Sequence, residues 1–205
     1  MQAKLITLDG IDGAGKTTQL EVIKNWFAMQ QMPVVFTREP GGTVLGEKLR
    51  ELLLSPESKV SLHTETLLMF AARRQHLEEV ILPALASGKH VVSDRFTDAT
   101  FAYQGGGRGM PHEKIAILET WVQDELRPDL TILLDVPLSV SLERIERSRD
   151  KDRFEREDAA FFERVRATYL QRAAQVPAYY AVIDSNREKA VVRAEIEAVL
   201  SALFA

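Results

Sequence analysis

The sequence Gly10-Ile11-Asp12-Gly13-Ala14-Gly15-Lys16-Thr17 decides the fold, because it matches G-x-x-x-x-G-K-[ST] in full. It follows a strand-like apolar run at 5–8 and opens a helical pattern at 16–29, as a phosphate-binding loop requires. Glycines in such a loop let backbone N–H groups surround a β-phosphate. Lys16 would reach the β- and γ-phosphates, and the Thr17 hydroxyl would hold Mg²⁺. We therefore predict that a nucleoside triphosphate binds to Gly10, Ile11, Asp12, Gly13, Ala14, Gly15, Lys16, Thr17 and Thr18.

On both sides of this loop, short apolar runs alternate with longer segments that can form helices. Strand-like runs occupy 5–8, 34–36, 90–93, 131–134 and 180–183. Helices are expected at 16–29, 47–54, 65–86, 113–125, 139–147, 159–174 and 189–204. This alternation indicates βαβ units, hence an α/β fold with a five-stranded parallel sheet flanked by helices. Because no linker or repeat interrupts the pattern, we predict one domain over 1–205, with ligands at the carboxyl ends of the strands.

Composition narrows the classes of protein. The 205 residues are 45% hydrophobic and 27% charged, as in ordinary globular domains. The absence of cysteine excludes disulfides, thiolate zinc sites, iron–sulfur clusters and cysteine nucleophiles. A net charge of −4 argues against a nucleic-acid partner, and no apolar run is long enough to cross a membrane. With a strand beginning close to Met1, no signal peptide is expected either, so we expect a cytoplasmic protein.

Other features separate the classes of P-loop protein. An N-K-x-D motif for reading guanine is missing, which disfavours a GTPase, and a single short domain disfavours a motor or transporter ATPase. Small kinases remain, so we predict a P-loop kinase fold, with a single P-loop nucleotide kinase domain over 1–205. Ten of the eleven glycines lie in three stretches, 10–15, 41–46 and 105–109, which we interpret as loops that need backbone freedom or close approach of a ligand.

Four further motifs are informative when they are considered together. They are Thr-Arg-Glu-Pro-Gly-Gly-Thr at 37–43, Phe-Ala-Ala-Arg-Arg at 70–74, Asp-Arg-Phe at 94–96 and Ala-Tyr-Gln-Gly-Gly-Gly-Arg-Gly at 102–109. With the phosphate-binding loop they resemble, in order and spacing, the bacterial thymidylate kinase family of nucleoside monophosphate kinases. The resemblance implies phosphorylation of dTMP to dTDP with ATP and Mg²⁺. It also implies a homodimer, which we expect to form through the long helix at 65–86.

The chemistry of phosphoryl transfer explains the charges. Several phosphates must meet in a small volume, and the second pKa of a phosphate monoester, about 6, leaves the attacking oxygen ionised. No general base is then required, and catalysis depends on positioning and positive charge. The candidates for this charge are Lys16, Arg38, Arg95, Arg149 and Arg153. We predict catalytic roles for Lys16, Arg95, Arg153 and Arg149, and the resemblance adds Asp12 to them.

The resemblance implies more specific roles for several of these residues. Asp94, together with Thr17, would hold Mg²⁺. Arg153 belongs to Asp-Arg-Phe-Glu at 152–155, which is similar to the family's lid, so a short mobile lid is expected at about 147–158, with Arg149 as a second lid arginine. The alternative is that the charged run at 143–166 is a solvated surface. Asp12 would meet the 3′-hydroxyl of the acceptor sugar.

Base recognition departs locally from the family pattern, which commonly has an aromatic residue four positions before the arginine that reads thymine O4. Phe70 precedes Arg73 by three and Arg74 by four, while Met69 lies four before Arg73. We expect Phe70 to stack on the base and Arg73 to read O4, with Arg74 as the alternative reader and a core position as the alternative for Phe70. The expected acceptor site consists of Arg38, Glu39, Arg50, Phe70, Arg73, Arg74, Arg95, Thr100, Tyr103 and Gln104.

Two rival functions remain open at this point. One is another nucleotide or deoxynucleoside kinase, acting for example on dUMP or dCMP. The other is a regulator that binds ATP without phosphoryl transfer, which the acceptor motifs and Arg153 disfavour. The four histidines show no metal-ligand spacing, and Trp121 is expected in the core or at an interface.

Overall fold

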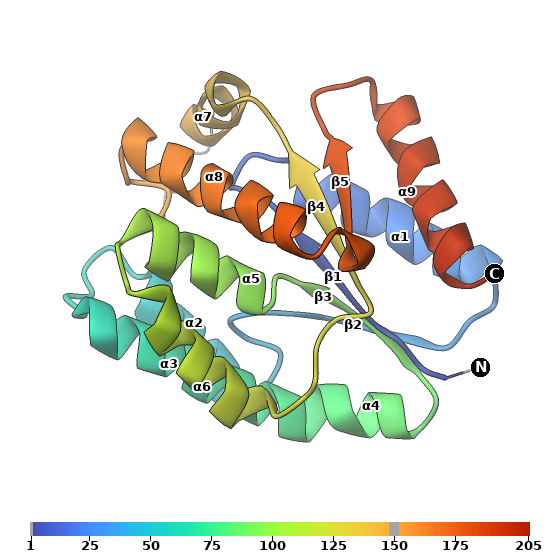
Figure 1. Ribbon diagram of the computed structural model, residues 1–205, viewed down its shortest axis with the longest axis horizontal. Helices are drawn as coiled ribbons and strands as arrows, with labels where there is room; N and C mark the ends of the chain where they lie inside the picture. Colours follow the sequence, from blue (N-terminus) through green and yellow to red (C-terminus); the bar gives the residue numbers. More distant parts are fainter. Residues whose placement is uncertain (1, 148–151) are drawn as a thin grey trace.

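The computed structural model describes residues 2–147 and 152–205 and confirms the α/β fold (Figure 1). Within these residues, five strands form one parallel sheet in the order β2-β3-β1-β4-β5. The strands are β1 (Leu5–Asp9), β2 (Val34–Arg38), β3 (His90–Asp94), β4 (Leu130–Asp135) and β5 (Tyr180–Asp184). β1 is buried along its whole length, as expected for a central strand covered on both faces.

The helices cover both faces of the sheet. In Figure 1, α1 (Lys16–Met29) and α9 (Lys189–Leu203) lie side by side on one face, and α3 (Leu62–His76), α4 (Leu82–Ala86) and α6 (His112–Gln123) gather on the other. The remaining helices are α2 (Val44–Leu54), α5 (Thr97–Thr100), α7 (Leu138–Glu146), α8 (Ala159–Gln175) and the short 3₁₀ turn η3 (Pro177–Tyr179). Among the described residues, no helix combines the length and apolarity needed to cross a bilayer.

The long helix expected at 65–86 is divided in the structure. Ser61 caps its start, three residues earlier than expected, by accepting a hydrogen bond from the Thr64 N–H. A π-helical turn, η1 (Leu77–Ile81), then separates α3 from α4. Pro83 lacks an N–H and so cannot continue the regular hydrogen-bond ladder, which accounts for an irregularity just before it.

Three of the four glycines in the third stretch lie in a helix rather than in a loop. Phe101–Gly107 forms a second π-helical segment, η2, directly after α5. A Cβ on Gly105 would lie 2.7 Å from the His112 ring, while one on Gly106 or Gly107 would collide with α8. The expectation of a loop was therefore wrong here, because these glycines provide space for close helix packing rather than backbone freedom.

The packing of α8 on η2 predicts the effect of a small substitution. Gly106→Ala should lower the free energy of unfolding by about 1–3 kcal/mol, because the new methyl would overlap Thr168 Oγ1 and the Arg164 carbonyl. Chemical denaturation measures the loss. Gly88→Asn is the control, since Gly88 has open space around it and a φ of +76° that asparagine tolerates. Equal stability of the two variants would contradict this packing argument.

Candidate functional site

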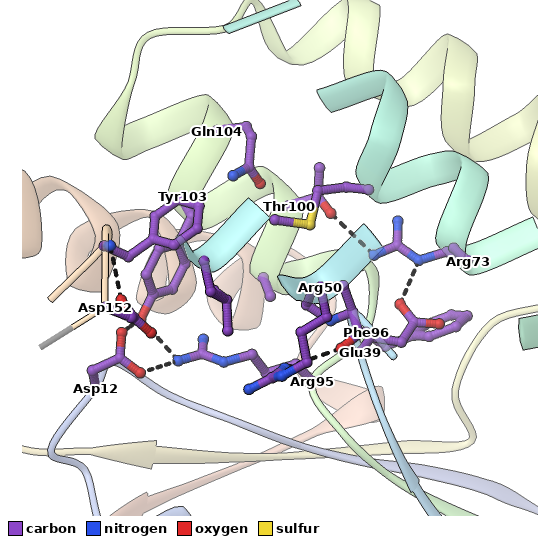
Figure 2. A pocket seen from close by; sticks show the side chains of 15 residues that line it. Asp12, Glu39, Arg50, Arg73, Arg95, Phe96, Thr100, Tyr103, Gln104 and Asp152 are labelled. Carbon is purple, nitrogen blue, oxygen red and sulfur yellow. Dashed lines mark hydrogen bonds and ion pairs between the residues drawn. The ribbon is translucent and has the colours of Figure 1, made fainter. Parts of the chain in front are cut away.

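A pocket lies beyond the carboxyl ends of β1, β2 and β3, where ligands bind in open parallel sheets (Figure 2). One wall comes from the phosphate-binding loop and the segment after β3, and the others from the 37–43 motif, α2, α3, α5 and η2. It is lined by Asp12, Glu39, Pro40, Arg50, Leu54, Met69, Arg73, Arg95, Phe96, Ala99, Thr100, Tyr103, Gln104, Asp152 and Phe154.

Asp12, Arg95 and Tyr103 form a polar cluster at the edge of this pocket. Arg95 Nη2 lies 2.5 Å from Asp12 Oδ1 and 2.9 Å from the Tyr103 hydroxyl, which donates to Asp12 Oδ2 at 2.7 Å. Burial alone would raise the pKa of Asp12, but Arg95, Lys16 and the Tyr103 hydroxyl outweigh it and lower that pKa to about 2. Arg95 has a left-handed φ of +68°, which turns its side chain back over the loop as it leaves β3.

The phosphate-binding loop has the backbone that its sequence predicts. Gly10, Gly13 and Gly15 all have positive φ, at +142°, +77° and +93°, where a side chain would be strained. Lys16 Nζ donates to the carbonyls of Gly10 and Ile11, each at 3.1 Å. Burial, and secondarily the repulsion from Arg95, lower the pKa of Lys16. A partly buried ammonium held at the phosphate-binding loop is suited to a polyphosphate.

One residue of this region was missed by the sequence reasoning. Arg144, on α7, donates through Nη1 to the Gly13 carbonyl at 2.8 Å and so lies against the loop. The neighbouring Ser141 donates to the Asp12 carbonyl at 2.7 Å, which fixes α7 on the loop. Arg144 belongs to the run of mixed charges at 143–166, in which spacing alone does not distinguish a ligand-facing arginine from a solvated one.

Asp94 and Thr17 are the candidate ligands for Mg²⁺. Asp94 ends β3, and its Oδ1 is buried without a hydrogen-bond partner within residues 2–147 and 152–205. Thr17 is exposed in the first turn of α1, on the loop. A buried, unpartnered carboxylate oxygen and a free hydroxyl fit a hard cation that takes most of its remaining ligands from phosphates and water. No group of three or more acidic, histidine or cysteine side chains within the described residues forms a metal cage of its own.

Asp9, at the end of β1, is completely buried. It accepts a hydrogen bond from the Tyr169 hydroxyl at 3.0 Å. Burial, and then the nearby Asp98 carboxylate, raise the pKa of Asp9 to about 7, against the opposing effects of Arg95, the Tyr169 hydrogen bond and Lys16. This agrees with a structural role for Asp9 at the strand end.

A pH dependence follows from Asp9. Its pKa is 3.8 in the unfolded reference and about 7 in the folded chain, so between these values the folded chain keeps a proton that the unfolded chain has lost. Stability from this group therefore falls as pH rises from about 4 to 7. From pH 5 to pH 8, the unfolding free energy of Asp9→Asn should gain roughly 2–3 kcal/mol relative to the parent protein. Denaturation at both pH values tests this, with exposed Glu51→Gln as the charge-loss control; a constant difference would contradict it.

Arg73 is held at the pocket by a buried network. Its Nε donates to Glu39 Oε2 at 2.7 Å and its Nη2 to Thr100 Oγ1 at 3.0 Å (Figure 2). Glu39 also accepts from His76 Nδ1 at 2.9 Å, and the Thr37 hydroxyl lies 2.6 Å from His76 Nε2. Arg73 is only 3% exposed, yet its Nη1 has no hydrogen-bond partner among the described residues. A buried donor left free in a pocket wall indicates the place of a ligand acceptor.

The other candidate base readers lie elsewhere. Arg74 pairs with Glu78 and donates to the Val122 carbonyl at 3.0 Å, so it faces α6 rather than the pocket. Phe70 is buried in the core, and Met69 lines the pocket instead. The structure thus brings Arg73 to the site and leaves out Arg74 and Phe70. The Arg73 guanidinium lies 4.8 Å from the Phe70 ring, so the three-residue spacing does place these two side chains together. The Phe70 ring, however, lies on the core side.

The acceptor-side arginines differ in position. Arg50 lines the pocket and donates to the Pro40 carbonyl at 3.0 Å. Arg38, at the exposed end of β2, pairs with Glu47 at 2.7 Å; that hydrogen bond raises the pKa of Arg38. Arg38 pairs in register with Asp94, so both residues sit at the same sheet edge.

The predicted lid falls only partly within the described residues. Arg149 lies outside them, in the 148–151 segment. Arg153 contacts the acceptor side: its Nε donates to the Leu53 carbonyl at 2.9 Å, and its Nη2 pairs with Glu65 at 2.5 Å. The structure therefore places Arg153 beside the wall that carries Asp152 and Phe154, on the acceptor side, rather than at the phosphate-binding loop.

Comparisons with known proteins identify the family of the chain. The sequence model of a family described as thymidylate kinase matches residues 8–196. A thymidylate kinase of Neisseria gonorrhoeae (strain NCCP11945) is 68% identical over 204 residues, covering 100% of this chain and 99% of its own. One from Cupriavidus pinatubonensis is 56% identical over 205 residues, covering 99% of this chain and 100% of its own. The crystal structure of a thymidylate kinase from Ehrlichia chaffeensis superposes with a TM-score of 0.80 at 34% identity, covering 98% of this chain and 99% of that one. The resemblance seen in the sequence motifs is confirmed, and the chain belongs to the thymidylate kinase family.

Proposed function

We propose that the chain is a thymidylate kinase that transfers the γ-phosphoryl group of ATP to dTMP and releases dTDP and ADP. The observation that carries this proposal is the shared Asp12–Arg95–Tyr103 cluster. Asp12 belongs to the phosphate-binding loop, while Arg95 and Tyr103 line the pocket with the free Arg73 nitrogen. A donor phosphate on the loop and an acceptor nucleotide in the pocket would thus be held by the same side chains.

Positioning and charge supply the catalysis in this mechanism. The acceptor phosphate is largely ionised at neutral pH, so its oxygen can attack without a general base. Asp12, with a pKa of about 2, would be a poor proton acceptor and instead suits a hydrogen bond from the sugar 3′-hydroxyl. Lys16 and Arg95 would balance the charge that develops between the two nucleotides, and Arg38 and Arg50 would hold the acceptor phosphate.

We assign Thr17 and Asp94 to Mg²⁺, supported by the unpartnered Asp94 Oδ1 at the end of β3. A bound Mg²⁺ would neutralise part of the triphosphate charge and orient the γ-phosphate.

Selection of deoxyribose rests on Tyr103. Its ring lines the pocket and packs edge-to-face against Phe154 at 5.8 Å and Phe161 at 5.9 Å. Because the hydroxyl is also bonded to Asp12 and Arg95, the ring cannot rotate away without breaking both bonds. A 2′-hydroxyl would collide with the ring or be buried without a partner, which costs about 1–3 kcal/mol.

We also propose a homodimer that buries an apolar surface on α3 and α6. These helices pack against each other, and each leaves large apolar side chains in solvent, among them Leu67, Ile117 and Trp121, which is 76% exposed. Trp121 lies one helical turn after Ile117, on the same face of α6. Light scattering should give twice the chain mass for the parent and the single-chain mass for Ile117→Glu; identical masses would exclude this surface.

The experiment for the whole proposal is coupled ADP release with dTMP, dUMP, dCMP, UMP or no acceptor. Efficiency should be highest for dTMP and next for dUMP, because one buried methyl is worth about 1 kcal/mol. dCMP and UMP should follow far behind. Background ADP release that does not respond to any acceptor would instead favour the non-catalytic regulator.

A further inference from the structure

Glu65 is a buried carboxylate beside the pocket described above, which we call the base pocket because it would hold the base of the acceptor nucleotide. It lies in the first turn of α3 and is 1% exposed. Two donors and one further cation surround it: Gln104 Nε2 donates at 2.8 Å and Arg153 Nη2 at 2.5 Å, and Arg108 forms an ion pair with its Nε 3.1 Å away. A charge this deeply buried is tolerated only with such partners, so its position is well determined.

The contact with Gln104 fixes the orientation of an amide. A carboxylate only accepts hydrogen bonds, so the Gln104 group that faces Glu65 is its NH₂. The carbonyl oxygen Oε1 is then the other end of the amide. Gln104 is 1% exposed and lines the base pocket beside Thr100 (Figure 2). Among the described residues, the hydrogen bond to Glu65 is the only one made by the Gln104 side chain, which leaves Oε1 for a ligand.

We infer that Glu65 is a positioning residue for base selection, which makes Gln104 present an acceptor to the base. This inference rests on the proposed function. Together, the free Arg73 Nη1 donor and the Gln104 Oε1 acceptor form a pattern complementary to thymine, which offers O4 as an acceptor and N3–H as a donor. Cytosine offers an amino donor and an unprotonated N3 acceptor, so both groups of the protein would oppose it.

A purely structural role for Glu65 is the competing explanation. Through Arg153 and Arg108, Glu65 also holds the segment after residue 151 against α3, and Phe154 of that segment lines the pocket. Loss of this anchor would loosen the pocket wall for every nucleotide. The two roles differ in one measurable quantity, the ratio of kcat/KM for dTMP to kcat/KM for dCMP.

The test compares Glu65→Gln with Arg153→Met by coupled ADP release. The glutamine at 65 can donate as well as accept, so Gln104 can turn and offer NH₂ to the base. We expect the dTMP/dCMP ratio to fall about tenfold or more in Glu65→Gln. Arg153→Met keeps the Glu65–Gln104 bond and should lower efficiency for both nucleotides alike. A ratio that is unchanged in Glu65→Gln, or reduced equally in Arg153→Met, overturns the inference.

An exchanged pair provides the rescue. In Glu65→Gln/Gln104→Glu, both oxygens of the carboxylate at 104 accept hydrogen bonds, so the orientation of that group no longer matters. The dTMP/dCMP ratio should recover towards the parent value, which a lost anchor would not produce. If Glu65→Gln does not fold, Glu65→Asp keeps the charge but is one methylene too short for Gln104, and the same fall in the ratio is expected; an unchanged ratio there also overturns the inference.

A measurement on the unsubstituted protein needs no variant. The monophosphate of N3-methylthymidine keeps the O4 carbonyl but has no N3–H to donate. We expect its kcat/KM to be about tenfold or more below that of dTMP, and equal values would refute the presented acceptor. Failure of the proposed function is seen separately, as the absence of ADP release with dTMP itself.

Discussion

Lys16→Ala is expected to lower kcat by about 10³-fold or more with an intact fold. The ammonium is held over the loop by the Gly10 and Ile11 carbonyls, where a β,γ-bridging position is preorganised. The fold should tolerate the loss of the Lys16 ammonium, because Asp12 keeps Arg95 and the Tyr103 hydroxyl as partners. Coupled ADP release at saturating ATP and dTMP measures the loss.

The control is Lys24→Ala on the same helix, farther from the loop. Lys24 is exposed to solvent and pairs with Glu21. Both variants should unfold within a few degrees of the parent protein. Only Lys16→Ala should lose turnover. A folded Lys16→Ala protein with parental kcat would remove the phosphate-binding loop from the mechanism.

Arg73→Met is expected to weaken base selection strongly and to destabilise the protein. The free Nη1 donor to the base would be lost while Gln104 keeps its acceptor, so the dTMP/dCMP ratio of kcat/KM should fall about tenfold or more without reaching 1. Among the described residues, the Glu39 carboxylate, at 4% exposure, would keep only the hydrogen bond from His76, and breaking a buried ion pair in this way costs about 3–5 kcal/mol. Nucleotide kinetics and denaturant unfolding measure the two effects.

The double variant Arg73→Met/Glu39→Gln separates them. Neutralising Glu39 should restore most of the stability, while selection stays at the reduced level of Arg73→Met. Arg74→Met is the matched neighbour, since Arg74 faces Glu78 and α6 and should leave selection intact. If Arg74→Met rather than Arg73→Met erased the preference for dTMP, the assignment of the reader would be reversed.

The parts of the site that could be predicted from sequence are those in which one contiguous segment performs the task. The phosphate-binding loop is such a segment, since Gly10, Gly13 and Gly15 supply the backbone angles locally. The sheet was also predictable, because strands buried on both faces read as continuous apolar runs.

What could not be predicted depends on packing between distant segments. The glycines at 105–107 are typical of a loop until α8 is placed against them. Phe70 and Met69 are neighbours on one helix, and only the position of β3 and α6 decides which of them faces the core. The sequence around Arg153 is typical of an arginine that binds phosphate. In the structure, however, Glu65, which is 88 positions away in the chain, holds Arg153 on the acceptor side.

The network of Arg73, Glu39, His76 and Thr37 also bears on resistance to inhibitors. A compound that imitates thymine would depend on Arg73, and escape by substituting that arginine would strand a buried carboxylate. The resulting loss of about 3–5 kcal/mol is a large part of the roughly 5–15 kcal/mol that holds a typical domain together. Escape would then require a second, compensating change at Glu39, so thymine-mimicking inhibitors aimed at Arg73 should meet a high genetic barrier to resistance.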